Sequence, residues 1–142
     1  MNIFLSVPFT SRTEATGAVE ASYRNKVEKL LQDLRNAGHE VFCAVEHAGW
    51  ELGGVALPAE EFKKDLEEIE NSDKIVVLLE ERISAGIQLE IGYAYAKGKP
   101  VEFYQIGKAT WSNIAFSQLA NNVCYPIQSV DDFVVQVLKH NT

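Results

Sequence analysis

Short apolar stretches alternate along this chain with longer segments in which apolar residues recur every three or four positions. The short stretches have the length and composition of β-strands, and they predict five strands at residues 2–7, 40–45, 74–79, 100–106 and 123–127. The longer segments predict helices at residues 19–37, 58–71, 84–98 and 112–119, and a last helix from residue 131. The third stretch is apolar almost throughout, as expected for a strand that helices cover on both faces.

This alternation predicts the fold class. Strands joined by helices of these lengths form a parallel sheet with right-handed crossovers. Five such units fit most economically into an α/β three-layer sandwich of the flavodoxin-like (Rossmann-like) type, with strand order 2-1-3-4-5. The 142 residues fit one domain that spans the chain. Because such sheets bind ligands beyond the carboxyl ends of their strands, the loops at residues 8–17, 46–57, 80–86 and 107–112 are the expected site walls.

Charge and composition limit the partners. The net charge is −7 and the 13 basic residues form no cluster, so we expect no polymeric nucleic acid as a partner. The apolar runs are strand-sized and the N-terminal segment lacks a basic region, so we expect no membrane span, no export signal and a cytoplasmic location. Cys43 and Cys124 stand in strand-like contexts, which favours buried, reduced thiols. No cluster has metal-ligand spacing, and we expect neither a metal nor a cofactor.

The segment from Ser84 to Gly98 contains the strongest chemical candidate. Glu90 is the only charged residue between positions 85 and 96, and helical spacing places it in one row with Gly86 and Ala94. Glycine within a helix costs on the order of 1 kcal/mol relative to alanine, so it indicates tight packing or the close approach of a ligand. Composition and spacing alone nevertheless favour a solvent-facing glutamate on an amphipathic helix.

Three segments of the chain carry a family resemblance. They are the pattern Ser84-x-Gly86-x-x-x-Glu90-x-Gly92 followed by Gly98-Lys-Pro-Val101, the stretch Lys64-Asp65-Leu66-x-x-Ile69-x-x-x-Asp73, and the N-terminal Ile3-Phe-Leu-Ser-Val-Pro-Phe. Together they resemble the nucleoside 2-deoxyribosyltransferase superfamily, which includes the 2′-deoxynucleoside 5′-phosphate N-hydrolases and the nucleotide hydrolases of antibiotic biosynthesis.

The resemblance implies a chemistry that suits a carboxylate. Glu90 matches the family's nucleophile. Departure of a nucleobase from C1′ passes through an oxocarbenium-like state, which a nearby carboxylate stabilises. The same carboxylate then forms a covalent glycosyl-enzyme, which water resolves in a hydrolase and a second base in a transferase. Asp65 matches an aspartate that contacts the base or sugar, so it is expected to orient the substrate or deliver a proton; the residues alone also fit an ordinary surface acid.

Further positions bear on the substrate. Ser84 stands where nucleotide hydrolases of the family carry serine and nucleoside transferases usually carry aspartate, so the resemblance favours a 5′-phosphate; a plain helix N-cap is its other role. Gly86 leaves the backbone open to a substrate. Ser6 aligns with the family's phosphate loop, but the glycines of that loop are missing and Arg12 comes late, which leaves phosphate recognition open. Ser112 resembles a family serine that reaches the phosphate bound in the site of a neighbouring subunit. The resemblance therefore also implies a homo-oligomer, a dimer or larger.

Four further residues have alternative roles. Phe9 and Trp50 lie in predicted loops, where they either stack on a base or cover the core. His47, which follows Glu46, stands at a position that resembles one in the family, although a lone histidine in a loop is more typical of the protein surface. Asp73 lies at a helix-to-strand junction and is expected to be structural.

The sequence therefore predicts an enzyme that cleaves the N-glycosidic bond of (deoxy)nucleotides or nucleosides through Glu90, with hydrolysis favoured over transfer. Its partner is a small-molecule nucleoside or nucleotide. The alternatives are a nucleoside 2-deoxyribosyltransferase, a non-catalytic nucleotide-binding module of the same fold, and cleavage of a nicotinamide dinucleotide. A receiver-like signalling domain is disfavoured, because such a domain needs an acidic pair after its first strand and the chain offers Leu5-Ser-Val-Pro-Phe there.

Overall fold

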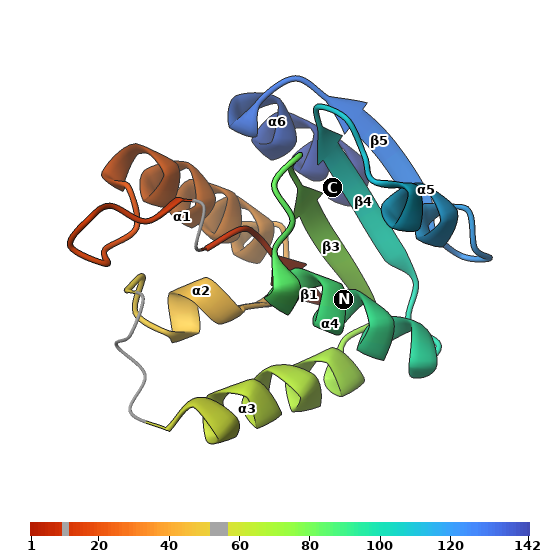
Figure 1. Ribbon diagram of the computed structural model, residues 1–142, viewed down its shortest axis with the longest axis horizontal. Coiled ribbons are helices and arrows are strands. Elements are labelled where there is room, and N and C mark those ends of the chain that lie inside the picture. Colours follow the sequence, from red (N-terminus) through yellow and green to blue (C-terminus); the bar gives the residue numbers. More distant parts are fainter. Residues whose placement is uncertain (10–11, 52–56) are drawn as a thin grey trace.

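Five parallel strands form the central sheet of the computed structural model, which describes residues 1–9, 12–51 and 57–142 (Figure 1). The strands are β1 (Asn2–Ser6), β2 (Glu40–Cys43), β3 (Lys74–Leu79), β4 (Val101–Ile106) and β5 (Val123–Ile127). Their order is β2-β1-β3-β4-β5, and each neighbouring pair is parallel. The predicted flavodoxin-like α/β fold and strand order are confirmed.

Helices cover both faces of the sheet. They are α1 (Ala21–Asn36), α2 (Ala44–His47), α3 (Pro58–Asn71), α4 (Ala85–Ala96), α5 (Trp111–Ser117) and α6 (Val130–Asn141). Side chains of α1 and α6 pack on one face with Leu5, Val76 and Leu78. Side chains of α3 and α4 pack on the other face with Phe4 and Val77, next to Phe116 of α5. Because successive strand residues point to opposite faces, β1 and β3 are buried on both sides.

Asp73 secures the amino end of the sheet. Its backbone N–H donates to the carbonyl of Asn2 at 2.7 Å, and its carboxylate accepts from the N–H of Asn2 at 2.7 Å. These paired bonds join the entry of β3 to the start of β1. Asp73 is therefore structural, as the sequence predicts, and it lies at the end of the sheet where the strands begin.

The sequence prediction is wrong at two places on the edge strands. Residues 44 and 45 belong to α2 and not to the second strand, whose pairing with β1 ends at Cys43. The guanidinium of Arg35 in α1 binds both carboxylate oxygens of Glu46 in α2, at 2.6 and 3.0 Å. Cys124 is exposed, whereas Cys43 is buried; both are free thiols. Cys124 lies on β5, the other edge strand, where most positions lack full helix cover.

Two loops are described in part. Residues 10–11 of the predicted loop 8–17 and residues 52–56 of the predicted loop 46–57 lie outside the described residues. Helix α1 begins two residues later than predicted, because Val19 forms an isolated bridge with Thr13.

None of the helices in the described ranges is long and apolar enough to cross a membrane.

Candidate active site

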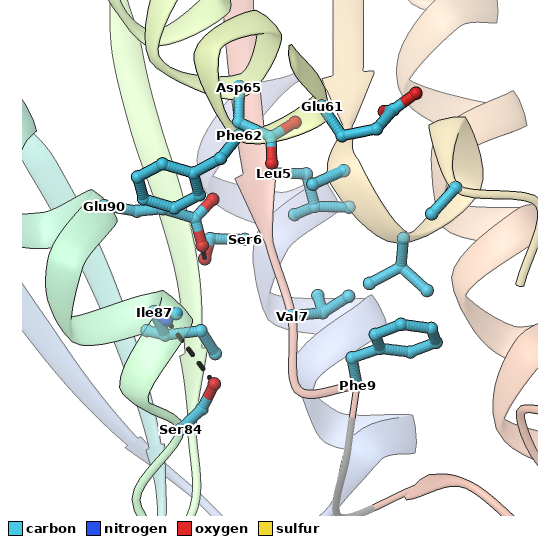
Figure 2. Close-up of a pocket in the computed structure, with 14 residues that line it drawn as sticks. Leu5, Ser6, Val7, Phe9, Glu61, Phe62, Asp65, Ser84, Ile87 and Glu90 are labelled. Atoms are coloured by element: carbon cyan, nitrogen blue, oxygen red, sulfur yellow. Dashed lines mark hydrogen bonds between the residues drawn. The ribbon is translucent and has the colours of Figure 1, made fainter. Parts of the chain in front are cut away.

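A cavity of about 240 Å³ opens beyond the carboxyl end of β1 (Figure 2). From β1 the chain continues to β2 on one side, whereas from the neighbouring strand β3 it continues to β4 on the other side. Ligands bind to sheets of this type where the strand order reverses in this way. The lining comes from β1 and the segment after it, from α2 and its C-terminal end, and from the N-terminal halves of α3 and α4: Leu5, Ser6, Val7, Phe9, Ala44, Val45, Ala48, Glu61, Phe62, Asp65, Ser84, Gly86, Ile87 and Glu90.

Glu90 points from α4 into this cavity (Figure 2). Ile87, Ile91 and Ala94 hold α4 against the sheet, which turns the adjacent face of the helix toward β1. The side chain is 7% exposed. Its Oε1 accepts a hydrogen bond of 3.1 Å from the Ser6 hydroxyl, while Oε2 is buried with no partner among the described residues. The prediction from composition and spacing alone, that Glu90 faces solvent, is therefore wrong.

Burial changes the acidity of Glu90. Removal from water disfavours the charged form, and the negative charge of Asp65 acts in the same direction, so the pKa rises from its ordinary 4.5 to about 8. The hydrogen bond from Ser6 opposes this rise because it favours the carboxylate. An acid in a cavity lining that holds its proton near neutral pH, with one oxygen left without a partner, is typical of catalytic carboxyl groups.

Asp65 faces the same cavity from α3, and Figure 2 shows its carboxyl group directed inward. Partial burial and the nearby charge of Glu61 raise its pKa to about 6, and His47 opposes them. The Oε2 atom of Glu61 lies 3.3 Å from Nε2 of His47, a residue outside the cavity lining. Asp65 and Glu90 thus line one cavity with different acid strengths, an arrangement that suits general acid–base and nucleophilic chemistry.

Ser6, Phe9, Ser84 and Gly86, all predicted substrate-binding positions, also line the cavity. Ser84 caps α4, since its Oγ accepts from the N–H of Ile87 at 3.4 Å, so the N-cap role is present.

Three other residues lie elsewhere. Ser112 is exposed on α5 and does not line the cavity. Trp50 is 5% exposed and packs in the core, which fits a cover for the core and not a base-stacking surface. Arg12 binds Glu80 and does not line the cavity.

Glu61 and Phe62 line the cavity although the sequence interpretation did not single them out. They precede Asp65 by four and three positions, so they share its helix face. That spacing was the signal available. Within the described ranges, no group of three or more acids, histidines or cysteines is placed to hold a metal ion.

Gly86 provides a direct test of how closely a ligand approaches α4. A Cβ at Gly86 or at Gly92 of the same helix would meet no atom within 4 Å, but only Gly86 lines the cavity. We expect Gly86→Ala to keep or raise the melting temperature, since alanine favours helix, and to raise KM by about tenfold or more by filling the substrate's space. Gly92→Ala is the matched control; equal kinetics for the two variants would contradict this role.

These features define a flavodoxin-like α/β protein with a pair of carboxyl groups in the crevice beside its first strand. The family model for nucleoside 2-deoxyribosyltransferase matches residues 15–124, and the chain belongs to that family. The search of curated proteins found no significant match.

Solved structures show the same fold. The CMP N-glycosidase BcmB of Clostridium botulinum aligns with a TM-score of 0.72 and 17% identity, covering 99% of both chains. A 2-deoxyribosyltransferase of Bacillus psychrosaccharolyticus aligns with a TM-score of 0.64 and 24% identity, covering 97% of this chain and 96% of that one. The solution structure of BlsM aligns with a TM-score of 0.70 and 19% identity, covering 99% and 88%.

Proposed function

We propose that this protein cleaves the N-glycosidic bond of a nucleoside or nucleotide, with Glu90 as the nucleophile and hydrolysis as the outcome. The observation that carries the proposal is the buried Glu90 carboxyl group in the lining of a cavity that Asp65 also lines. One of its oxygens is held by Ser6, and the other is buried without a hydrogen-bond partner among the described residues. Family membership supports a substrate of this class. The similar structures include a CMP N-glycosidase and a 2-deoxyribosyltransferase.

The two acids divide the work of a double displacement. As the bond from C1′ to the base breaks, the ionised Glu90 oxygen stabilises the positive charge on the sugar and bonds to C1′. In the empty cavity Asp65 is the stronger acid, so it is the ionised group that can accept a proton. As positive charge develops at C1′ and stabilises the Glu90 carboxylate, Glu90 passes its proton to Asp65, which delivers it to the departing base. Ser6 keeps the other oxygen of Glu90 in position. Water then attacks C1′, loses its proton to Asp65 and frees Glu90, with retained configuration.

A panel of (deoxy)nucleosides and their monophosphates, with detection of the free base by chromatography, tests this function. The proposal predicts release of base without a second base in the mixture. Release that requires an added base would identify a transferase. Stabilisation of the protein by a ligand without any release, unaffected by Glu90→Gln, would identify a non-catalytic binding module.

Ser84 is proposed to hold a 5′-phosphate together with the N–H groups at the start of α4. If so, Ser84→Ala lowers kcat/KM for the monophosphate relative to the nucleoside by about tenfold. Loss of the helix cap by itself lowers stability by about 1 kcal/mol and leaves that ratio unchanged. Ser129→Ala is the matched control, because Ser129 caps α6 in the same way, with its oxygen 3.1 Å from the N–H of Asp132. An unchanged substrate ratio in Ser84→Ala would remove the phosphate role.

We also propose a homo-oligomer in which Ser112 acts on the site of a neighbouring subunit. Ser112 does not line the cavity of its own chain, and the adjacent Trp111 is 81% exposed at the start of α5. Light scattering measures the mass in solution. A monomer that is fully active would exclude this arrangement.

A further inference from the structure

The cavity is acidic. Its lining contains the carboxyl groups of Glu61, Asp65 and Glu90, and within the described residues it contains no lysine, arginine or histidine. The basic groups on the segments after β1 and β2 are paired with acids: Arg12 binds Glu80, and His47 lies 3.3 Å from Glu61. The ionisable side chains that a ligand meets in this described lining are therefore all acids, while the N–H groups proposed above to hold a phosphate lie at the start of α4.

Within the part of the chain that the structure describes, no cationic side chain lines the cavity to compensate the charge of Glu90 when it ionises. The groups that face it are the Ser6 hydroxyl from β1, the Asp65 carboxyl from α3 and the Cys43 thiol from β2. Burial raises the pKa of that thiol to about 12, so it is neutral and supplies no cation. The side chain of Glu90 is 7% exposed, and its Oε2 is unpartnered among the described residues. A positive charge on the ligand would compensate the charge of this carboxylate when it ionises.

We propose that the substrate is a nucleoside or nucleotide whose aromatic base is a permanent cation, as in an N-glycosylpyridinium; this inference rests on the proposed N-glycosidase function. Phe9 and Phe62 line the same cavity, and aromatic rings attract cationic rings placed over their faces. Binding such a base lets Asp65 and Glu90 ionise together, since the cation offsets the repulsion between them.

The reaction of a cationic base needs no proton at the leaving group. Glu90 bonds to C1′, the bond from C1′ to the ring nitrogen breaks, and its electron pair remains on the nitrogen, so the base departs neutral. Water then bonds to C1′, the bond to Glu90 breaks, and Asp65 takes the proton of the water before releasing it to solvent. A neutral base instead requires an ionised Glu90 and a protonated Asp65, the reverse of their acid strengths in the empty cavity.

Nicotinamide riboside and 1,4-dihydronicotinamide riboside test the proposal, because they differ little in shape while only the first is a cation. Carbocyclic versions of both, which cannot be hydrolysed, permit calorimetry on the wild-type protein. We expect the cation to bind about tenfold more tightly or better at pH 8. Asp65→Asn reduces this preference at least about threefold. Glu67→Gln, an exposed position of the same helix outside the lining, leaves it unchanged.

In turnover, we expect kcat/KM for nicotinamide riboside to exceed that of uncharged nucleosides by about tenfold or more. Equal affinity for the cation and its neutral analogue would overturn this inference. Glu90-dependent hydrolysis of uncharged nucleosides with no preference for the cation would do the same and leave the proposed function intact. No release of base from any of these compounds would overturn both.

Discussion

Glu90→Gln is expected to lower the rate of base release by about a thousandfold or more. Glutamine has nearly the shape of glutamate and can still accept the hydrogen bond from Ser6, but its amide cannot form the glycosyl ester or stabilise the developing cation with a full charge. The loss falls on kcat and kcat/KM alike, because the interaction exists mainly in the transition state. Chromatographic assay of free base with purified wild-type and variant protein measures it.

Glu67→Gln is the control for this substitution. It makes the same chemical change on α3, where the side chain is exposed and does not line the cavity, and it should retain full activity. Circular dichroism and the melting temperature establish that both variants are folded. Wild-type rates in Glu90→Gln would refute the proposed mechanism.

The stability of the wild-type protein is expected to fall as the pH rises from about 5 to 9. The folded state holds a proton on Glu90 up to a pKa of about 8, whereas the unfolded chain loses it near 4.5. The folded state therefore binds more protons between these values, and the free energy of unfolding decreases with pH across that window. The shift sets an upper limit of about 5 kcal/mol for this contribution. Urea unfolding at pH 5, 7 and 9 measures the change.

Glu90→Gln separates this effect from other titrating groups. Asp65, whose pKa is raised to about 6, contributes in the same direction but remains in both proteins. The variant should consequently lose less stability than the wild type between pH 5 and 9 and become the more stable of the two at pH 9. Parallel stability curves would mean that Glu90 is well solvated and that the cavity does not shield it.

Much of the fold could be predicted from the chain because each central strand carries its own signal. Residues 75–79 are all buried, so their apolar run needs no partner to be recognised. The edge strands lack this signal: residues 44 and 45 are apolar yet helical, and Cys124 lies in an apolar context yet is exposed. Contacts between elements, such as the ion pair between Arg35 of α1 and Glu46 of α2, are not contained in the local apolar pattern.

The site was predictable where one helix carries the pattern. Gly86 and Glu90 are one helical turn apart, and Asp65 belongs to a second motif, so the resemblance located all three. The bond between Ser6 and Glu90 joins residues 84 positions apart, and the burial that raises the pKa of Glu90 arises from packing between elements. Local spacing contains neither. The exposed position of Ser112 likewise depends on how α5 packs against the rest of the protein, which no sequence motif predicts.

Mass spectrometry of the protein after reaction with a 2′-fluoro nucleoside analogue tests the central claim most directly. Fluorine at C2′ destabilises the oxocarbenium-like state, and where it slows the second step more than the first, the glycosyl-enzyme accumulates. We predict a mass increase of one fluorinated sugar, located by proteolysis on the peptide that contains Glu90, and no such increase in Glu90→Gln. An adduct on a different residue, or an equal adduct in the variant, would contradict the account.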